Sequence, residues 1–409
     1  MTGNGPRPLE GVRVLDLTRV LAGPHAARML CDLGAEVIKV EPPEGDITRT
    51  TYPRINSISG YFAQQNGGKR CISIDLDHQA GRDLLMRLAD VSDVLVENFR
   101  PGVMDRLGMG PDVLRARNPR LIFASVSGYG QTGPWVHRRA YAPVVGAESG
   151  FTKAQGDAGR GHYANDPHSH ADVYTAVECG AAILAALYQR ERTGVGDRID
   201  IAMAQTMLYI NEHAADHLWD GDVPEGVIRS FRPMDYPVLT AANGEMVVIS
   251  GHPAENVTFD FYMAAIGRLD EVRSDPRFAD TGARLAHLDV IHQMLIDWGR
   301  TIADAEAIED AMSQHRLAVG RLRSVHDVCE TDWADERGAV VEMTDRGDGT
   351  IRVPNTPWKF AGSDVRTGGA PRYRGEDNRA VLSEVLGLTD AQLDTLEADG
   401  VLTSRLPRR

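Results

Sequence analysis

His168–Met203 reads HSHADVYTAVECGAAILAALYQRERTGVGDRIDIAM. From Val173 to Tyr188 nearly every residue is Val, Ala, Ile, Leu or Gly, and a helix that is apolar on every face is typical of the interior of a large domain. The charged QRERTG segment predicts the end of this helix, with Gly194 as a left-handed cap, and the alternation that begins at Arg198 predicts a strand. The stretch therefore predicts a large domain built around a buried helix.

Asp172 stands at the entrance of this helix. One interpretation makes it the N-cap, because Asp is among the favoured capping residues. The other makes it a nucleophile, because an ionised carboxylate held away from water can attack an acyl group. The two interpretations are compatible, since the amides and the dipole at a helix N-terminus favour the ionised form.

Composition narrows the possible classes of protein. The chain has 409 residues, of which 42% are hydrophobic and 25% charged, and this is ordinary for a globular protein large enough for two domains. A formal charge of −14 argues against binding to nucleic acid or to anionic membranes. No signal peptide opens the chain and no apolar run approaches a membrane span, so we expect a cytoplasmic location.

The cysteines indicate neither a disulfide framework nor a zinc site, because they show no CxxC pairing. We expect four reduced thiols, most of them buried: Cys31, Cys71, Cys179 and Cys329.

The N-terminal part repeats a strand-helix-strand pattern. It begins with a strand at 12–17, a turn at Gly23-Pro24, a helix at 25–33 closed by Gly34, and a strand at 35–41. Further elements are expected as strands at 71–76, 93–97 and 120–126 and a helix at 79–89. Such alternation predicts a parallel sheet covered by helices on both faces, with a ligand crevice beyond the carboxyl ends of the strands.

A nucleotide-binding sheet invites comparison with dehydrogenases, because Glu41 ends the second strand. The first strand-to-helix turn, TRVLAGP, lacks the GxGxxG glycines that a dinucleotide needs, and no GxxxxGK[ST] loop occurs. The Gly67–Arg70 turn is the segment most similar to a phosphate-binding loop, but it can equally be a simple connection between two segments. NAD and P-loop enzymes are therefore disfavoured.

The second half of the chain predicts a smaller unit. A helix is expected at 205–219 and a linker at 220–235, after which Asn243-Gly244 predicts a hairpin between strands at 236–241 and 245–250. Two more helices are expected at 254–267 and 284–300.

The order of several segments resembles the class III CoA-transferases, the CaiB/BaiF group. The matching segments are LEGVRVLDLTRVLAGPHAARMLCDLGAEVIKVEPPEGD (9–46), GGKRCISIDLDH (67–78), VLVENFRPGVMDRLG (94–108), NPRLIFASVSGYGQTGP (118–134), the Asp172 stretch, DPRF (275–278), RGAVVEM (337–343), PWKFAG (357–362) and the segment 375–402. Each is weak alone, but together they cover nearly the whole chain.

The resemblance implies an α/β fold: a large Rossmann-like parallel-sheet domain built from both ends of the chain, a smaller α+β domain, and an interlocked homodimer. The expected parts are the large CoA-binding domain at 1–219, the linker at 220–235, the small domain at 236–324, and a C-terminal part at 325–409 that returns to the large domain.

The resemblance also implies an acyl-CoA transferase that moves CoA from an acyl-CoA donor to a carboxylic acid. Asp172 would form an anhydride, then an aspartyl-CoA thioester, and no cofactor would be bound permanently. The residues that match the family's CoA-binding positions are Val20, Leu21, Ile74, Asn98, Phe99, Arg106, Arg139 and Tyr141. An α-methylacyl-CoA racemase and a non-catalytic CoA-binding protein are the alternatives.

Some positions depart from the family's patterns. Leu21 stands where formyl-CoA transferases carry Gln, and their glycine-rich loop is not found, which argues against formate or oxalate as substrates. Tyr141 stands where the racemases carry a His, and a phenol with a pKa near 10 is a poor base at neutral pH. Of the two histidines beside Asp172, His168 and His170, either could contact the acceptor acid, but we favour plain loop residues. A metal site is not expected.

Overall fold

The computed structural model of the chain describes residues 5–158, 161–222 and 233–406, which form two compact units. Unit 1 joins the residues up to Ile210 to those from Asp332 onward, and unit 2 covers Asn211–Thr331. Most of the predicted linker, 223–232, lies outside the described residues. The predicted domain boundaries stay predictions.

Unit 1 is built on a six-stranded parallel sheet with the strand order β5-β2-β1-β6-β7-β8. The strands are β1 (Arg13–Asp16), β2 (Glu36–Glu41), β5 (Arg70–Ser73), β6 (Val94–Glu97), β7 (Ile122–Ser127) and β8 (Arg198–Ala202). All neighbouring pairs are parallel, and Leu15 of β1 lies level with Ile38 of β2 and Leu95 of β6. The predicted parallel sheet is confirmed.

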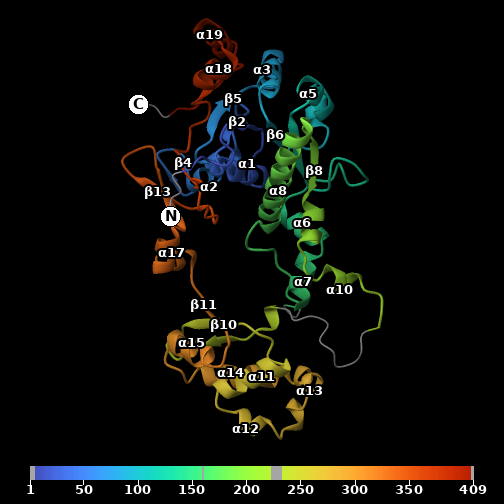
Figure 1. Cartoon of the computed structure of the whole chain (residues 1–409), viewed down its shortest axis with the longest axis vertical. Coiled ribbons are helices and arrows are strands. Elements are labelled where there is room, and N and C mark those ends of the chain that lie inside the picture. The colour runs from blue at the N-terminus through green and yellow to red at the C-terminus, as the bar shows by residue number, and fades with distance from the viewer. Residues whose placement is uncertain (1–4, 159–160, 223–232, 407–409) are drawn as a thin grey trace. The chain divides into compact units, whose positions relative to one another are not determined.

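Alternate strand residues point into two different apolar layers. Leu15, Leu95 and Phe123 face a layer formed with α3 (Gln79–Asp90), α5 (Pro111–Arg117), α18 (Asn378–Leu386) and α19 (Asp390–Ala398). Val14 and Val94 face the other layer, formed with α1 (Ala22–Asp32) and α8 (His170–Thr193). Figure 1 shows the C-terminal helices α18 and α19, in red, near the N-terminal α3, so both ends of the chain build this unit.

Shorter elements complete unit 1. They are η1 (Ile47–Thr50), β3 (Arg54–Ile55), β4 (Ile58–Ser59), α2 (Gly60–Asn66), α4 (Val103–Arg106), α6 (Ala142–Glu148), α7 (Phe151–Ala158), α9 (Met203–Tyr209), α17 (Asp332–Arg337), β12 (Val340–Thr344) and β13 (Thr350–Pro354). Two of them, η1 and α2, follow β2 and contact one another beside α1.

Unit 2 is a small α+β unit. Its antiparallel sheet has the order β11-β10-β9, from β9 (Val238–Thr240), β10 (Met246–Ile249) and β11 (Val319–Arg321). Its helices are α10 (Ala214–Leu218), η2 (Pro233–Asp235), α11 (Asn256–Ala265), α12 (Leu269–Val272), η3 (Pro276–Phe278), α13 (Thr281–Ala286), α14 (Leu288–Gly299), α15 (Ala305–Ser313) and α16 (Val325–Cys329). The predicted hairpin at Asn243-Gly244 is confirmed, because it joins β9 to β10.

Three local predictions are wrong. Gly23 and Pro24 lie in the first turn of α1, where the missing N–H of proline has no helical partner to lose. The expected helix at 205–219 is two helices, because the Asn211 side chain accepts the His213 N–H at 3.0 Å and ends the helical pattern. The expected helix at 284–300 is interrupted at His287, whose backbone is not helical (φ −123°, ψ 29°).

By length and composition alone, helix α8 is long and apolar enough to cross a membrane, contrary to the expectation that no segment would be. The core helices of globular proteins can have the same length and composition, and α8 packs on α1, α9 and β7. The cytoplasmic location stays a prediction.

Candidate active site

The site begins at the point where the connections of the sheet change direction. In chain order the six strands run 3-2-1-4-5-6, so the direction reverses between β1 and β6, and a crevice is expected beyond their carboxyl ends. The Asn98 side chain joins the loops that leave these two strands. Its Oδ1 accepts the Arg19 N–H at 2.9 Å, and its Nδ2 donates to the Arg19 carbonyl at 2.8 Å.

The loop after β1 is strained at Val20. This residue has a φ of +72°, a left-handed conformation that a β-branched side chain rarely adopts. Leu21 follows as the N-cap of α1, without a side-chain cap, so the first amides of α1 are free to meet another acceptor. Both predicted CoA-binding residues of this turn therefore stand at the start of a helix.

Asp172 provides that acceptor. It lies in the first turn of α8 but is not its N-cap, which is Ser169, so the predicted capping role is wrong. Instead its half-buried carboxylate accepts a hydrogen bond from the backbone N–H of Ala22, the first residue of α1.

Burial controls the ionisation of this carboxylate. Burial raises the pKa of Asp172 from 3.8 to about 6, and the Ala22 N–H only partly offsets the rise. An amide at a helix N-terminus does favour the ionised form, but that helix is α1 and not α8, and burial has the larger effect on the pKa. At neutral pH the group is still mostly ionised, and it has few water contacts to lose before it reacts.

Tyr61 is a neighbour that the sequence analysis missed. It stands in the first turn of α2, and burial together with the negative charge of Asp172 raises the pKa of its phenol to about 12. The phenol therefore stays protonated and can donate a hydrogen bond near the nucleophile. A local signal existed, since Ser59 caps a short helix in ISGYF, but nothing in it points to Asp172.

Glu97 was also missed. It ends β6, next to Asn98, and it is buried at 4% exposure. One of its oxygens accepts the Phe99 N–H at 2.8 Å. Burial raises the pKa of this carboxyl to about 7, although hydrogen bonds from Ser125 and Phe99 oppose the rise.

The other predicted CoA-binding residues differ in accessibility. Ile74 is fully buried in the core, whereas Phe99 is half-buried with the Arg19 guanidinium 5.9 Å from its ring centre. Arg106 and Arg139 are exposed, and no ion pair links either to another described residue. Tyr141 is exposed and precedes α6, a helix that packs against α8.

Of the two histidines, His168 is an exposed loop residue as predicted, whereas His170 is not. His170 is the first residue of α8, and its ring nitrogen lies 2.6 Å from an Asp166 carboxylate oxygen. His168 is exposed, with its ring 5.6 Å from that of His170.

No group of three or more His, Cys, Asp or Glu residues able to hold a metal ion occurs in the part of the chain that the structure describes. Cys31, Cys71 and Cys179 are buried free thiols.

Comparison with known proteins adds a family. The model of CoA-transferase family III matches residues 9–378. A formyl-CoA:oxalate CoA-transferase of Streptomyces coelicolor is 33% identical over 97% of this chain and 99% of its own length. The probable fatty acyl-CoA transferase Rv3272 of Mycobacterium tuberculosis is 34% identical over 93% and 99%. A succinyl-CoA:mesaconate CoA-transferase of Haloarcula hispanica is 31% identical over 92% and 96%.

Solved structures give the same result. A crystal structure of Rv3272 aligns with a TM-score of 0.78 at 32% identity, covering 92% of this chain and 99% of that one. A CaiB/BaiF family protein from Brucella suis aligns with a TM-score of 0.79 at 29% identity, covering 93% and 100%.

Proposed function

Because the chain belongs to CoA-transferase family III, we propose that it moves CoA from an acyl-CoA to a carboxylic acid through covalent intermediates on Asp172. The observation that carries this proposal is the half-buried Asp172 carboxylate, held by the first amide of α1. A carboxylate that is ionised at neutral pH but poorly hydrated is a competent nucleophile.

The proposed sequence exchanges acyl bonds without water. An Asp172 oxygen attacks the thioester carbon and the carbon–sulfur bond breaks. CoA departs as the thiolate, and the acyl group remains on Asp172 as a mixed anhydride. The thiolate then attacks the aspartyl carbon, releasing the donor acid and forming an aspartyl-CoA thioester. The acceptor carboxylate displaces the thiolate to form a second anhydride, and attack of the thiolate on the acceptor's carbonyl carbon regenerates Asp172. In this proposal the Ala22 N–H, which favours the ionised carboxylate, would also stabilise negative charge on the aspartyl oxygen in these steps.

CoA would lie along the crevice between β1 and β6. In this proposal Val20, Leu21, Asn98 and Phe99 line the crevice. Ile74 would support the crevice from the core, and Tyr141 would border it. The exposed arginines Arg106 and Arg139 would bind the phosphates of CoA, because a chain with a net negative charge needs local positive charges to hold them.

A trapping experiment tests the mechanism. The protein is mixed with an acyl-CoA, the products are captured with hydroxylamine or borohydride, and peptides are analysed by mass spectrometry. We expect an adduct on Asp172 that Asp172→Ala lacks and that Glu178→Ala, a control on the same helix, retains. If no adduct forms and the substrate α-proton exchanges with deuterium, the racemase alternative is supported instead.

Substrate identity requires a screen. The relatives' names specify oxalate, mesaconate and fatty acyl groups, and these belong to those proteins. Leu21 places an apolar, nearly buried side chain at the first turn, which favours acids with an apolar part over oxalate. A panel of donors and acceptors, assayed with the wild type and Leu21→Gln, tests this: oxalate should be used poorly by the wild type and better by the variant.

We also propose a homodimer. Helix α8 is apolar on every face, yet Tyr174, Val177 and Tyr188 are exposed, as are Leu208 and Tyr209 of α9. A large exposed apolar face is typical of an interaction surface. Light scattering after gel filtration should give twice the chain mass, and Tyr188→Asp should lower it; a wild-type monomer would refute this.

A further inference from the structure

Four buried charged side chains lie beneath the turn that leads into α1, and none takes part in the proposed chemistry. They are Asp16, Lys39, Asp46 and Lys69, each at most 1% exposed. We propose that they are positioning residues, which hold Val20 in its strained conformation and thereby aim the Ala22 N–H at Asp172. This inference rests on the proposed role of Asp172.

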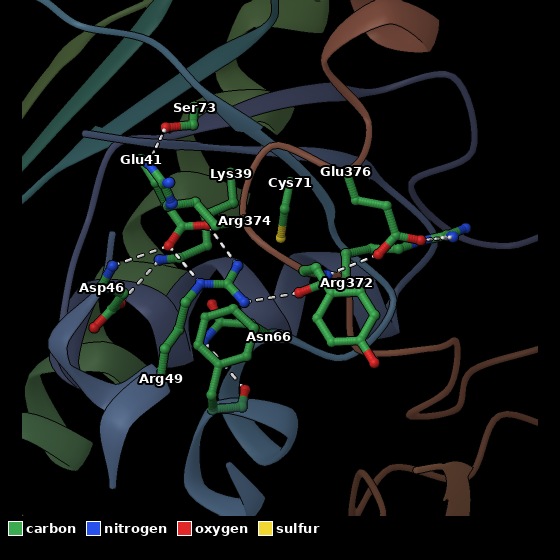
Figure 2. Close-up of polar contacts among 12 residues, drawn as sticks. Lys39, Glu41, Asp46, Arg49, Asn66, Cys71, Ser73, Arg372, Arg374 and Glu376 are labelled. Carbon is green, nitrogen blue, oxygen red and sulfur yellow. Dashed lines mark hydrogen bonds and ion pairs between the residues drawn. The ribbon is translucent and has the colours of Figure 1, made fainter. Parts of the chain in front are cut away.

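The Lys39–Asp46 pair holds the middle of the turn. The Asp46 carboxylate accepts the Val20 N–H at 3.3 Å, and Lys39 Nζ lies 3.1 Å from it while donating to the Thr18 carbonyl at 2.8 Å. Asp46 is itself fixed, since its backbone N–H donates to Glu41 at 2.9 Å. Figure 2 shows Lys39 and Asp46 close to Glu41, which also binds Arg49.

The Asp16–Lys69 pair holds the two ends of the turn. Asp16 accepts the Thr18 N–H at 2.9 Å and the Thr18 hydroxyl. Lys69 Nζ donates to Asp16 at 2.8 Å and also, at 2.8 Å, to the carbonyl of Pro24 inside α1. One ion pair thus ties the exit of β1 to the first turn of the helix that meets Asp172.

Close packing leaves the turn little freedom. A Cβ added at Gly23 would lie 2.3 Å from Thr18 Cβ, so only glycine lets the start of α1 approach Thr18 this closely. Burial would raise the pKa of Asp16, but the charges of Lys69 and Lys39 overcome it and lower that pKa to about 2. The Asp16 carboxylate is therefore ionised at neutral pH, and its charge opposes the lowering of the Lys69 pKa that burial causes.

A purely stabilising role explains these residues less well. Buried ion pairs often stabilise a fold no more than apolar side chains of equal size would. The left-handed conformation of Val20 also costs free energy of folding. Such strain persists only where many surrounding contacts fix the backbone, and it is common at functional sites. Here those contacts converge on the one turn that delivers an amide to Asp172.

Asp46→Asn tests the inference, with Asp32→Asn as the matched control. Asp32 is also buried and ion-paired, with Arg28, but it ends α1, about 15 Å from Ala22. The readouts are the single-turnover rate of adduct formation on Asp172 and the pH dependence of that rate.

We expect Asp46→Asn to lower the adduct rate about tenfold or more and to move the midpoint of its pH profile upward, because the amide that favours the ionised carboxylate is displaced. Asp32→Asn should leave both within about twofold. Because glycine adopts the left-handed conformation without strain, the loss caused by Asp46→Asn should shrink to about threefold in a Val20→Gly background.

The outcomes separate the two proposals. Absence of an adduct in the wild type overturns the proposed function and this inference with it. An adduct in the wild type, with Asp46→Asn and Asp32→Asn behaving alike or with no relief by Val20→Gly, overturns this inference alone. If Asp46→Asn does not fold, circular dichroism should show that Val20→Gly/Asp46→Asn does; a double variant that also fails to fold refutes the strain argument.

Discussion

Replacing Asp172 with Asn should make the protein inactive but more stable at neutral pH. The carboxylate has a pKa of 3.8 in an ordinary setting and about 6 in the fold, a difference that corresponds to about 3 kcal/mol of unfavourable ionisation. Because the group is only half-buried and an amide also loses water contacts, we expect a gain of about 1–2 kcal/mol in the free energy of unfolding at pH 7. The asparagine Oδ1 can still accept the Ala22 N–H.

The effect of Asp172 ionisation on the free energy of unfolding should depend on pH. The folded-state pKa lies above the unfolded value, so the folded protein binds this proton more tightly. Ionisation therefore costs stability fully above about pH 6, and the cost vanishes below about pH 4. The stability difference between Asp172→Asn and the wild type should grow across this window and then level off.

Urea denaturation followed by circular dichroism at pH 4, 5, 6 and 7 measures this difference. Asp16→Asn is the control with the opposite sign, because the pKa of Asp16 is lowered to about 2 and its loss leaves Lys69 unpaired. That variant should lose about 3–5 kcal/mol at pH 7. An Asp172→Asn protein that is no more stable than the wild type at pH 7, or whose gain is the same at pH 4, would refute the reasoning.

Three further predictions concern other residues of the proposed site. Tyr61→Phe should lower the rate of adduct formation about tenfold with little change in the KM for acyl-CoA, because it removes a donor that stays protonated; equal changes in both constants would contradict this. Arg106→Ala and Arg139→Ala should each raise that KM about tenfold and weaken its dependence on salt, with kcat nearly unchanged, which steady-state kinetics at two salt concentrations can check. The wild type should lose affinity for CoA above pH 7, where Glu97 ionises beside the Phe99 turn, and Glu97→Gln should remove most of this loss. Titration calorimetry at pH 6 and 8 measures the affinity of both proteins.

Much of the sheet could be predicted because its strands are short apolar runs buried on both faces, and Val94–Glu97 is an example. Errors arose where a local signal has two physical meanings. Gly23-Pro24 predicts a turn, yet proline also fits the first turn of a helix, and only the packing of α1 on Thr18 decides between them.

The site was only partly predictable for a different reason. Asp172 could be found because an acidic residue opens an apolar helix, and the family resemblance, which the family model confirms, gave it a role. Tyr61 and Asp46 could not be found, because the approach of Tyr61 to Asp172 and of Asp46 to Val20 arises from tertiary packing. Likewise, no sequence pattern reports that Val20 has a positive φ, since valine is a poor residue for that conformation.

The capping error itself bears on the mechanism. Had Asp172 capped α8, its carboxylate would have accepted hydrogen bonds from the amides of its own helix and would not have contacted α1. Ser169 occupies the cap position, so the carboxylate instead meets the N-terminus of α1, a helix that packs alongside α8 but begins at the strained turn after β1. A nucleophile held by a second helix depends on where that helix starts. The start of α1 depends in turn on Val20 and the buried charges beneath it, so side chains that never touch a substrate should influence the reactivity of Asp172.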